Sequence, residues 1–254
     1  MFASRAITLI TGASAGLGVD FARQLSAKGH RLVLAARRGD RLETLAAELG
    51  NARAITIDLG KPGAAAKLMA DIAATGEQVE VLVNNAGFGL GGRFAELDGP
   101  RQREMIDLNI ATLTDLCRIV APQMIERRSG AILNVASTAA FQPGPGMAVY
   151  FATKAYVLSF TEALHEELKP FGIKVSALCP GPTKTEFGRV AGFGEKGAFD
   201  RMSMDSAAVV RIGIEGLDHN KAVVITGAMN KIGAASTRFV PRSIVRKIAG
   251  ALKL

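Results

Sequence analysis

The chain has 254 residues, of which 48% are apolar and 21% charged, and its formal net charge is +8. This length and apolar content suit one α/β domain with a full core, and they exclude a disordered protein. Two cysteines are too few for a disulfide framework, so we expect a reducing, cytoplasmic setting. The positive charge suggests nucleic acid or an anionic membrane as a partner, and the position of the basic residues along the chain decides whether either partner is expected.

Short aliphatic runs alternate with longer amphipathic segments along most of the sequence. Nearly continuous apolar strands separated by helices predict right-handed βαβ crossovers and a parallel sheet that is buried on both faces. We therefore expect a single α/β domain with a doubly wound, seven-stranded parallel sheet and helices on both faces. The expected strands are 6–10, 31–35, 54–57, 79–83, 131–135, 174–178 and 222–226, and the expected helices are 17–28, 41–49, 64–75, 101–127, 149–169 and 207–217.

A glycine-rich loop, Thr-Gly-Ala-Ser-Ala-Gly-Leu-Gly at 11–18, connects the first expected strand to the first helix. Glycines let the backbone approach a pyrophosphate closely, and the helix N-terminus offers free N–H groups. The spacing Gly-x-x-x-Gly-x-Gly differs from both the common dinucleotide fingerprint and the Walker loop. The loop therefore predicts a nucleotide site, with a plain tight turn as the alternative.

Two arginines, Arg37 and Arg38, follow the second expected strand, where an acidic residue would bind the adenine ribose of NAD(H). Guanidinium groups instead suit the additional 2′-phosphate of NADP(H). The pair therefore favours NADP(H), unless both side chains are simply solvated at the surface.

Tyr150 and Lys154 lie four positions apart in an expected helix and so share one face. A cation beside a phenol favours the phenolate, which would lower the pKa of Tyr150 toward neutrality and suit it to acid–base work. Ser137 follows the fifth strand and would reach the same sheet edge. These three residues predict a reaction centre beside the glycine-rich loop.

The segment 180–205 breaks the alternation of strands and helices, with five glycines and scattered Phe and Met. It follows the sixth strand, at the edge where open α/β sheets bind ligands, so we expect a lid over the pocket. A flexible connection without function is the alternative.

The ordered motifs together resemble the short-chain dehydrogenase/reductase family in its compact, single-domain form. The resemblance covers residues 7–226 and implies a Rossmann-like fold. It rests on the glycine-rich loop, Asp58, Asn84-Asn85-Ala86-Gly87, Asn109, Ser137, Tyr150 with Lys154, and Pro180-Gly181 followed by Thr185.

The resemblance implies an NADP(H)-dependent oxidoreductase that interconverts a carbonyl and a secondary alcohol by direct hydride transfer, without a metal. Tyr150 would be the general acid/base, Ser137 would polarise the substrate oxygen, Lys154 would lower the pKa of Tyr150 and bind ribose, and Asn109 would position a water. The implied cofactor-binding residues are Gly12, Ser14, Gly16, Leu17, Gly18, Arg37, Arg38, Asp58, Asn84, Gly87, Tyr150, Lys154, Pro180, Gly181 and Thr185. Among them, Ser14 and Arg37 would contact the 2′-phosphate, with Arg38 ranked below Arg37, and Asn84 and Gly87 would contact the adenosine side of the cofactor.

The direction of reaction and the substrate are less constrained. Aromatic and Met side chains at 141, 147, 187, 193 and 199 favour a reductase of a lipophilic ketone or aldehyde. The alternatives are a non-catalytic NADP(H) sensor and an isomerase or dehydratase that uses bound cofactor transiently. The resemblance also implies a homodimer or homotetramer built on the helices 101–127 and 149–169.

The positive charge lies at the C-terminus. Asp218 is the last acidic residue and seven basic residues follow it, so the other 24 of the 31 basic residues nearly balance the 23 acidic ones. A nucleic-acid partner is therefore not expected for the catalytic domain at 1–235. Residues 236–254 predict a basic amphipathic helix, which could lie on an anionic membrane or pack on its own domain or a sister subunit. Its apolar face carries Ile244, Val245, Ile248, Ala249 and Leu252, and its basic residues are Arg242, Arg246, Lys247 and Lys253.

Overall fold

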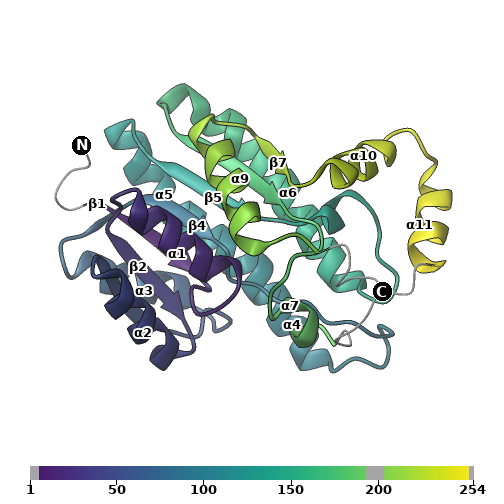
Figure 1. The fold of residues 1–254 in the computed structure, drawn as a ribbon, viewed down its shortest axis with the longest axis horizontal. Helices are drawn as coiled ribbons and strands as arrows, with labels where there is room; N and C mark the ends of the chain where they lie inside the picture. The colour runs from purple at the N-terminus through teal and green to yellow at the C-terminus, as the bar shows by residue number, and fades with distance from the viewer. Residues whose placement is uncertain (1–5, 193–202, 252–254) are drawn as a thin grey trace.

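The computed structural model describes residues 6–192 and 203–251, which form a sheet with helices on both of its faces (Figure 1). The expected element types and order are confirmed from the first strand to the seventh. The strands are β1 (Ala6–Thr11), β2 (Leu32–Ala36), β3 (Ala52–Thr56), β4 (Gln78–Asn84), β5 (Ala131–Val135), β6 (Lys174–Cys179) and β7 (Val223–Ile225). The helices that cover the sheet are α1 (Leu17–Ala27), α2 (Gly39–Leu49), α3 (Ala64–Ala73), α5 (Leu113–Arg127), α6 (Ala148–Leu168) and α9 (Ser206–Asp218).

All seven strands are parallel, in the order β3-β2-β1-β4-β5-β6-β7. The chain first builds outward from β1 through β2 to β3, and then returns to place β4 on the other side of β1. The carboxyl ends of β1 and β4 therefore flank the point where the strand order reverses. Open α/β sheets bind ligands at such a point, so this topology places the site.

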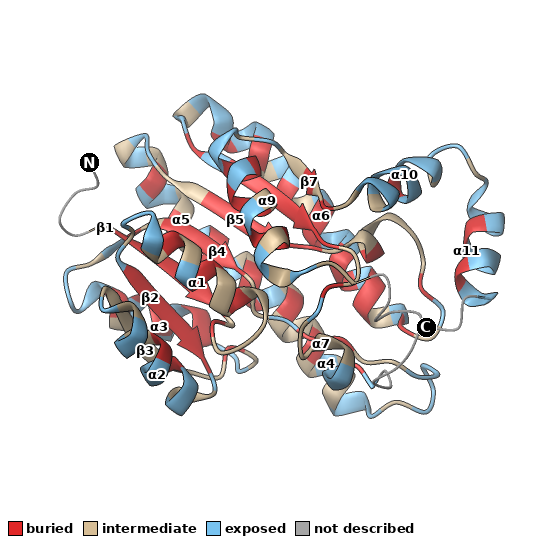
Figure 2. Cartoon of the chain, in the orientation of Figure 1, coloured by how far each residue is buried: buried red, intermediate tan, exposed pale blue. Residues whose placement is uncertain are grey.

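Two apolar cores lie on the two faces of the sheet, and successive strand residues alternate between them. Leu9 packs into the core beneath α3, α5 and α6, whereas Ile10 packs into the core beneath α1, α2 and α9. Both side chains are fully buried, as most of the sheet is (Figure 2). Burial on both faces explains why the strands are nearly continuous apolar runs rather than alternating ones.

The expected helix at 101–127 is interrupted by a π-helical turn. Helix α4 (Gly99–Ile106) begins after Asp98, whose carboxylate accepts a hydrogen bond from the Arg101 amide at 2.7 Å. Residues Asp107–Thr112 then form the π-helical turn before α5 begins. Such turns are rare and concentrate at functional sites, and this one carries Asn109.

Besides α9, the described residues after β6 form the α-helices α7, α10 and α11. The segment 180–205 contains the short helix α7 (Phe187–Val190), while positions 193 and 199, where apolar side chains were expected in the lid, fall outside the described residues. Helix α10 (Ala228–Ser236), which the sequence analysis missed, precedes α11 (Arg242–Ala251). Among the described residues, no helix has the length and apolar character needed to cross a membrane.

The predicted C-terminal helix is α11, and its apolar face is divided. Val245 and Ala249 are buried, whereas Ile244 and Ile248 are exposed. The helix lies beside the loop that precedes α6, since a Cβ on Gly250 would lie 3.5 Å from a Pro145 side-chain carbon. Figure 1 shows α10 and α11 as an arm beyond β7, at one edge of the sheet.

Candidate active site

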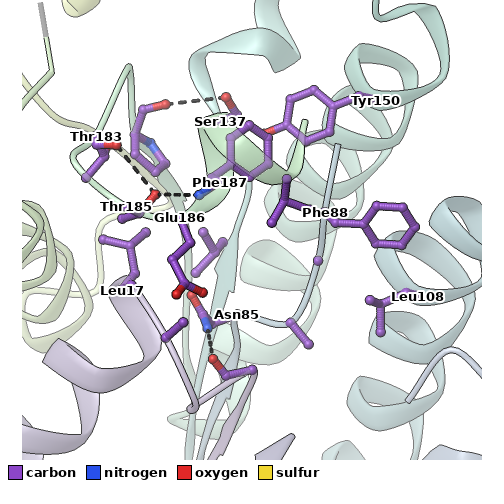
Figure 3. A pocket seen from close by; sticks show the side chains of 18 of the residues that line it. Leu17, Asn85, Phe88, Leu108, Ser137, Tyr150, Thr183, Thr185, Glu186 and Phe187 are labelled. Atoms are coloured by element: carbon purple, nitrogen blue, oxygen red, sulfur yellow. Dashed lines mark hydrogen bonds between the residues drawn. The ribbon is translucent and has the colours of Figure 1, made fainter. Parts of the chain in front are cut away.

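A cavity of about 540 Å³ opens at the carboxyl ends of the strands, beside the reversal between β1 and β4 (Figure 3). Its volume falls within the usual range for ligand sites, about 300–1,000 Å³. The topology brings together residues that are up to 178 positions apart in sequence, from Gly12 in the glycine-rich loop to Val190 after β6. Of the predicted site residues, the lining includes Gly12, Ser14, Gly16, Leu17, Arg37, Arg38, Asp58, Gly87, Ser137, Tyr150, Lys154, Pro180, Gly181 and Thr185.

The glycine-rich loop forms one wall of the cavity, and its glycines are sterically required. Gly12 and Gly16 have φ of 67° and 54°, a region that other residues rarely adopt. A Cβ on Gly12 would lie 2.8 Å from the Ala86 Cα. Gly18 does not line the cavity; a Cβ there would lie 2.3 Å from the Gly12 carbonyl oxygen. Gly12 and Gly16 therefore allow a tight turn that lines the cavity, and Gly18 permits the start of α1 to pack close to Gly12.

Arg38 and Ser14 form a polar group beside this loop. The Arg38 Nε donates to the Ser14 hydroxyl at 3.2 Å, and its Nη2 lies 3.4 Å from the Ser14 carbonyl oxygen. Arg38 also donates to the carboxylate of Glu186 at 2.9 Å. Arg37 lines the cavity as well but points to Glu104, at 3.3 Å. The sequence analysis ranked Arg37 first, whereas the structure gives Arg38 the closer contacts with Ser14.

Ser137, Tyr150 and Lys154 lie together at another wall of the cavity. Tyr150 and Lys154 project from the same face of α6, with the Lys154 Nζ 5.8 Å from the Tyr150 ring centre. The Nζ donates to the Val135 carbonyl at the end of β5, at 2.8 Å. Ser137 is in extended backbone just after β5, and its hydroxyl donates to the Pro180 carbonyl at 3.4 Å. The end of β5 thus positions both Ser137 and Lys154.

Burial dominates the acid–base behaviour of this group. Tyr150 is buried and Phe187 packs on it, with ring centres 5.2 Å apart. Burial raises the pKa of the Tyr150 phenol to about 12, against a smaller lowering by the Ser137 hydroxyl. It also lowers the pKa of the Lys154 ammonium to about 8. The expected fall of the Tyr150 pKa toward neutrality is therefore wrong for this structure, because loss of water around the phenol outweighs the hydrogen bond with Ser137.

Asn109 lies behind the cavity wall rather than in it. Its side-chain amide donates to the Phe88 carbonyl at 3.0 Å and to the Thr153 hydroxyl at 3.1 Å, while its oxygen accepts from the Phe88 amide at 3.2 Å. A Cβ on Gly87 would lie 2.9 Å from the Asn109 oxygen and 3.7 Å from the Lys154 Nζ. Asn109 therefore fixes the chain that follows β4 and lies close to Lys154.

Asn84 does not line the cavity, and its contact with the adenosine side of the cofactor stays a prediction. Its side chain points into the protein, where it donates to the Asn134 oxygen at 2.9 Å and the Cys117 sulfur at 3.3 Å. The next residue, Asn85, lines the cavity and donates to the Thr11 carbonyl at 2.9 Å. The reason is strand alternation, because Asn84 is still part of β4 and faces the core that also holds Leu82.

The comparisons with known proteins identify this arrangement. The family model for short chain dehydrogenase matches residues 6–193, about three quarters of the chain. The chain belongs to the short-chain dehydrogenase family. This confirms the resemblance stated from the motifs, and with it the class of oxidoreductases that act on CH–OH and C=O groups.

Three relatives illustrate the similarity within the family. The NADP-dependent 3-hydroxy acid dehydrogenase YdfG of Salmonella typhi is 39% identical over 187 residues, which cover 72% of this chain and 75% of the relative. A short-chain dehydrogenase from Sphingobium yanoikuyae, solved in complex with NADPH, has a TM-score of 0.82 at 33% identity and covers 92% of this chain and 94% of its own. The bulky-bulky ketone specific alcohol dehydrogenase from Comamonas testosteroni has a TM-score of 0.77 at 30% identity, with 92% coverage of both chains. The predicted Rossmann-like, single-domain fold is thereby confirmed, and the cofactor named for the first two relatives agrees with the predicted NADP(H).

Several cavity residues were missed by the sequence analysis of this short-chain dehydrogenase. Asn85 could have been found from the alternation along β4, which assigns Asn84 to the core. Phe88 and Glu186 had no such signal, because their place in the cavity depends on contacts with distant parts of the chain. Phe88 packs beneath the Arg101 guanidinium, 4.4 Å from its ring centre, and Glu186 contacts Arg38. Neither pairing is visible as a sequence motif.

Proposed function

We propose that this chain is an NADP(H)-dependent reductase that converts a ketone or aldehyde to an alcohol. The observation that carries the proposal is one cavity with two chemically different ends. Ser14 and Arg38 offer a hydroxyl and a cation suited to a 2′-phosphate at one end, and Ser137, Tyr150 and Lys154 meet at the other. The glycine-rich loop lines the cavity at Gly12 and Gly16, beside the N-terminus of α1, and would hold a pyrophosphate between the two ends.

The raised pKa of Tyr150 is compatible with a role as proton donor in the reduction. A phenol with a pKa of about 12 stays protonated throughout the neutral range, so it holds a proton that it can transfer when the substrate oxygen gains negative charge. Bound NADPH would supply the hydride to the substrate carbon. Ser137 would hold the substrate oxygen, Tyr150 would protonate it, and Lys154 would stabilise the phenolate that remains. Asn109 would keep a water near Lys154, through which the proton is replaced.

Replacement of Tyr150 with Phe tests this assignment. Tyr150→Phe removes the proton donor but keeps the ring, so we expect turnover to fall by at least about 10²-fold while NADPH binding is retained. The matched control is Tyr156→Phe, since Tyr156 is the other tyrosine of the chain and lies exposed on the same helix. Turnover by Tyr150→Phe at the parent rate would show that another group is the acid.

The preference for NADP(H) would depend on Arg38 more than on Arg37. A charge-assisted hydrogen bond to a phosphate is worth about 1.5–3 kcal/mol, so we expect Arg38→Ala to weaken NADPH binding by roughly 10- to 100-fold and to leave NADH binding nearly unchanged. Arg37→Ala, whose guanidinium is directed to Glu104, should have the smaller effect. Tighter binding of NADH than of NADPH by the parent chain would refute the cofactor assignment.

The remaining cofactor contacts are proposed from the cavity lining. Asp58 lies beyond β3 and would meet the adenine, with its carboxylate already accepting from the Gly60 amide at 3.1 Å. Gly87 would lie along the cofactor between the loop and Lys154. Thr185, whose hydroxyl accepts from the Phe187 amide at 3.2 Å, would face the nicotinamide end or a phosphate, beside Pro180 and Gly181.

An apolar substrate is supported by the side chains near Tyr150. Phe88, Met147, Phe151 and Phe187 gather around it as one apolar cluster. The relative from Comamonas testosteroni is named for bulky ketones, which agrees with such a pocket, whereas the Salmonella relative is named for 3-hydroxy acids. We propose a lipophilic ketone or aldehyde, and NADPH oxidation measured with bulky ketones against 3-oxo acids would decide between the two classes.

We also propose that residues 1–235 form the catalytic domain, with a lid at about 180–205. We further propose that residues 236–254 form a basic helix that contacts an anionic membrane surface. Large apolar side chains are exposed along this arm, among them Phe239, Ile244 and Ile248. No acidic residue follows Asp218 to repel anionic headgroups. The buried free thiols of Cys117 and Cys179 support a reducing, cytoplasmic location.

Vesicle flotation tests the membrane contact. We expect the parent chain to float with phosphatidylserine vesicles but not with neutral ones, and the double variant Phe239→Ser, Ile248→Ser to stay in the dense fraction. Absence of binding by both proteins would exclude the membrane. Members of this family act on small molecules and commonly form oligomers. The alternative to a membrane contact is therefore a homodimer or homotetramer whose subunit interface lies at this arm or at the helices 101–127 and 149–169. If the interface lies at the arm, sedimentation of the double variant would show a smaller assembly than that of the parent chain.

A further inference from the structure

The carboxylate of Glu186 lies among three guanidinium groups. The Arg38 Nη1 is 2.9 Å from its Oε2, the Arg41 Nη1 is 3.0 Å from its Oε1, and the Arg189 Nη2 is 3.7 Å from its Oε1. The contacts with Arg38 and Arg41 hold the pKa of Glu186 below its ordinary value, so the carboxylate is ionised at neutral pH. Arg38 and Arg41 flank the start of α2, whereas Glu186 follows β6. The carboxylate therefore joins two distant parts of the chain.

Arg38 is the same side chain that we propose for the 2′-phosphate of NADP(H). A guanidinium offers five N–H groups, and Arg38 already directs its Nε and Nη2 to Ser14 and its Nη1 to Glu186. A phosphate that reached this guanidinium would lie close to the Glu186 carboxylate. The phosphate and the carboxylate would repel each other, and they would compete for the donors of this one arginine.

The segment that carries Glu186 rests directly on the glycine-rich loop. A Cβ on Gly16 would lie 3.1 Å from the Thr185 side chain. Figure 3 shows that Glu186 and Phe187 extend in different directions, with Phe187 toward Tyr150 and the carboxylate away from it. Glu186 is thus placed at the phosphate end of the cavity rather than at the reaction centre.

We propose that Glu186 is an internal anion that occupies Arg38, the arginine of the proposed 2′-phosphate subsite, and that the 2′-phosphate of NADP(H) displaces it from Arg38 on binding. The inference rests on the proposed NADP(H) function. The exchange replaces one carboxylate–guanidinium pair with one phosphate–guanidinium pair, so Glu186 lowers the affinity for a 2′-phosphorylated nucleotide. A nucleotide without this phosphate leaves the pair intact. Glu186 therefore sets how strongly the chain prefers NADP(H) over NAD(H).

A fixed structural role for Glu186 leads to the opposite expectation. If the carboxylate served only to hold Arg38 and Arg41 in position for the phosphate, its removal would let both side chains move and would weaken phosphate binding. The two roles therefore differ in the sign of the effect.

Calorimetric titration with two nucleotides separates these roles without requiring catalysis. Adenosine 5′-monophosphate and adenosine 2′,5′-bisphosphate differ only in the 2′-phosphate, so the ratio of their dissociation constants isolates the subsite. We expect Glu186→Gln and Glu186→Ala to raise the preference for the bisphosphate by about three- to tenfold, the range for release of one or two exposed ion pairs.

The matched control is Glu215→Gln, which removes the same charge from an exposed carboxylate paired with Arg211 on α9. We expect this control to keep the ratio of the parent chain. An unchanged ratio or a lower one in both Glu186 variants would overturn the displacement. If the parent chain bound the two nucleotides equally, the proposed NADP(H) preference itself would fail, which is a separate result from the behaviour of the variants.

Discussion

Lys154 is a buried cation, and its replacement with Met should stabilise the protein while it removes activity. Burial lowers the pKa of its ammonium from 10.5 to about 8, because the folded protein gives the charge less solvation than water does. The difference of about 2.5 pH units corresponds to about 3 kcal/mol of lost folding free energy wherever the amine is protonated in both states. Met removes this cost but also the hydrogen bond to the Val135 carbonyl, worth about 1–2 kcal/mol. We therefore expect Lys154→Met to gain about 1–2 kcal/mol at pH 7.

The dependence on pH gives the sharper test. A lowered pKa means that the unfolded chain binds more protons than the folded one between about pH 8 and 10.5, so the parent gains stability as the pH rises through this range. The advantage of Lys154→Met should accordingly fall by about 2–3 kcal/mol between pH 7 and pH 10 and change sign. Urea unfolding followed by circular dichroism, with both proteins at each pH, measures the difference directly. A difference that stays constant with pH would refute a perturbed lysine.

Two further outcomes follow from packing and burial. Gly18→Ala should destabilise the protein by about 1–3 kcal/mol, because its Cβ would lie 2.3 Å from the Gly12 carbonyl oxygen. The control Gly233→Ala in α10 places its Cβ in open space and should be neutral or stabilising. Thermal unfolding of the two variants measures the difference, and equal changes in stability would contradict the steric argument. Burial raises the pKa of both the Cys117 and Cys179 thiols to about 12. A thiol-specific disulfide reagent at pH 8 should therefore modify neither thiol in the folded protein, and should modify both thiols in urea. Rapid labelling of the folded protein would show that a thiol is accessible.

The sequence was most informative where structure is local. The glycine-rich loop, the spacing of Tyr150 and Lys154, and the apolar strands each depend on residues within one turn or one strand. These features can therefore be predicted before the fold is known. The boundaries of the elements were also close, since caps and breakers such as Asp98 act on neighbouring residues.

The sequence was least informative about the direction in which a side chain points. Neighbouring candidates such as Asn84 and Asn85 have the same chemistry, and only the register of β4 assigns one to the core and the other to the cavity. The acidity of Tyr150 also depends on tertiary structure, because burial raises the pKa of a phenol that Phe187 packs against.

The sequence by itself determined the fold class, the family and the chemical groups at the site, because strand and helix patterns and short motifs act over a few residues. Tertiary structure decided which of those groups meet. Arg38 faces Ser14 and is paired with Glu186, which lies 148 positions away, whereas the adjacent Arg37 turns to Glu104. Contacts of this kind form only when the parallel strands bring their carboxyl ends to one edge, so no local pattern contains them.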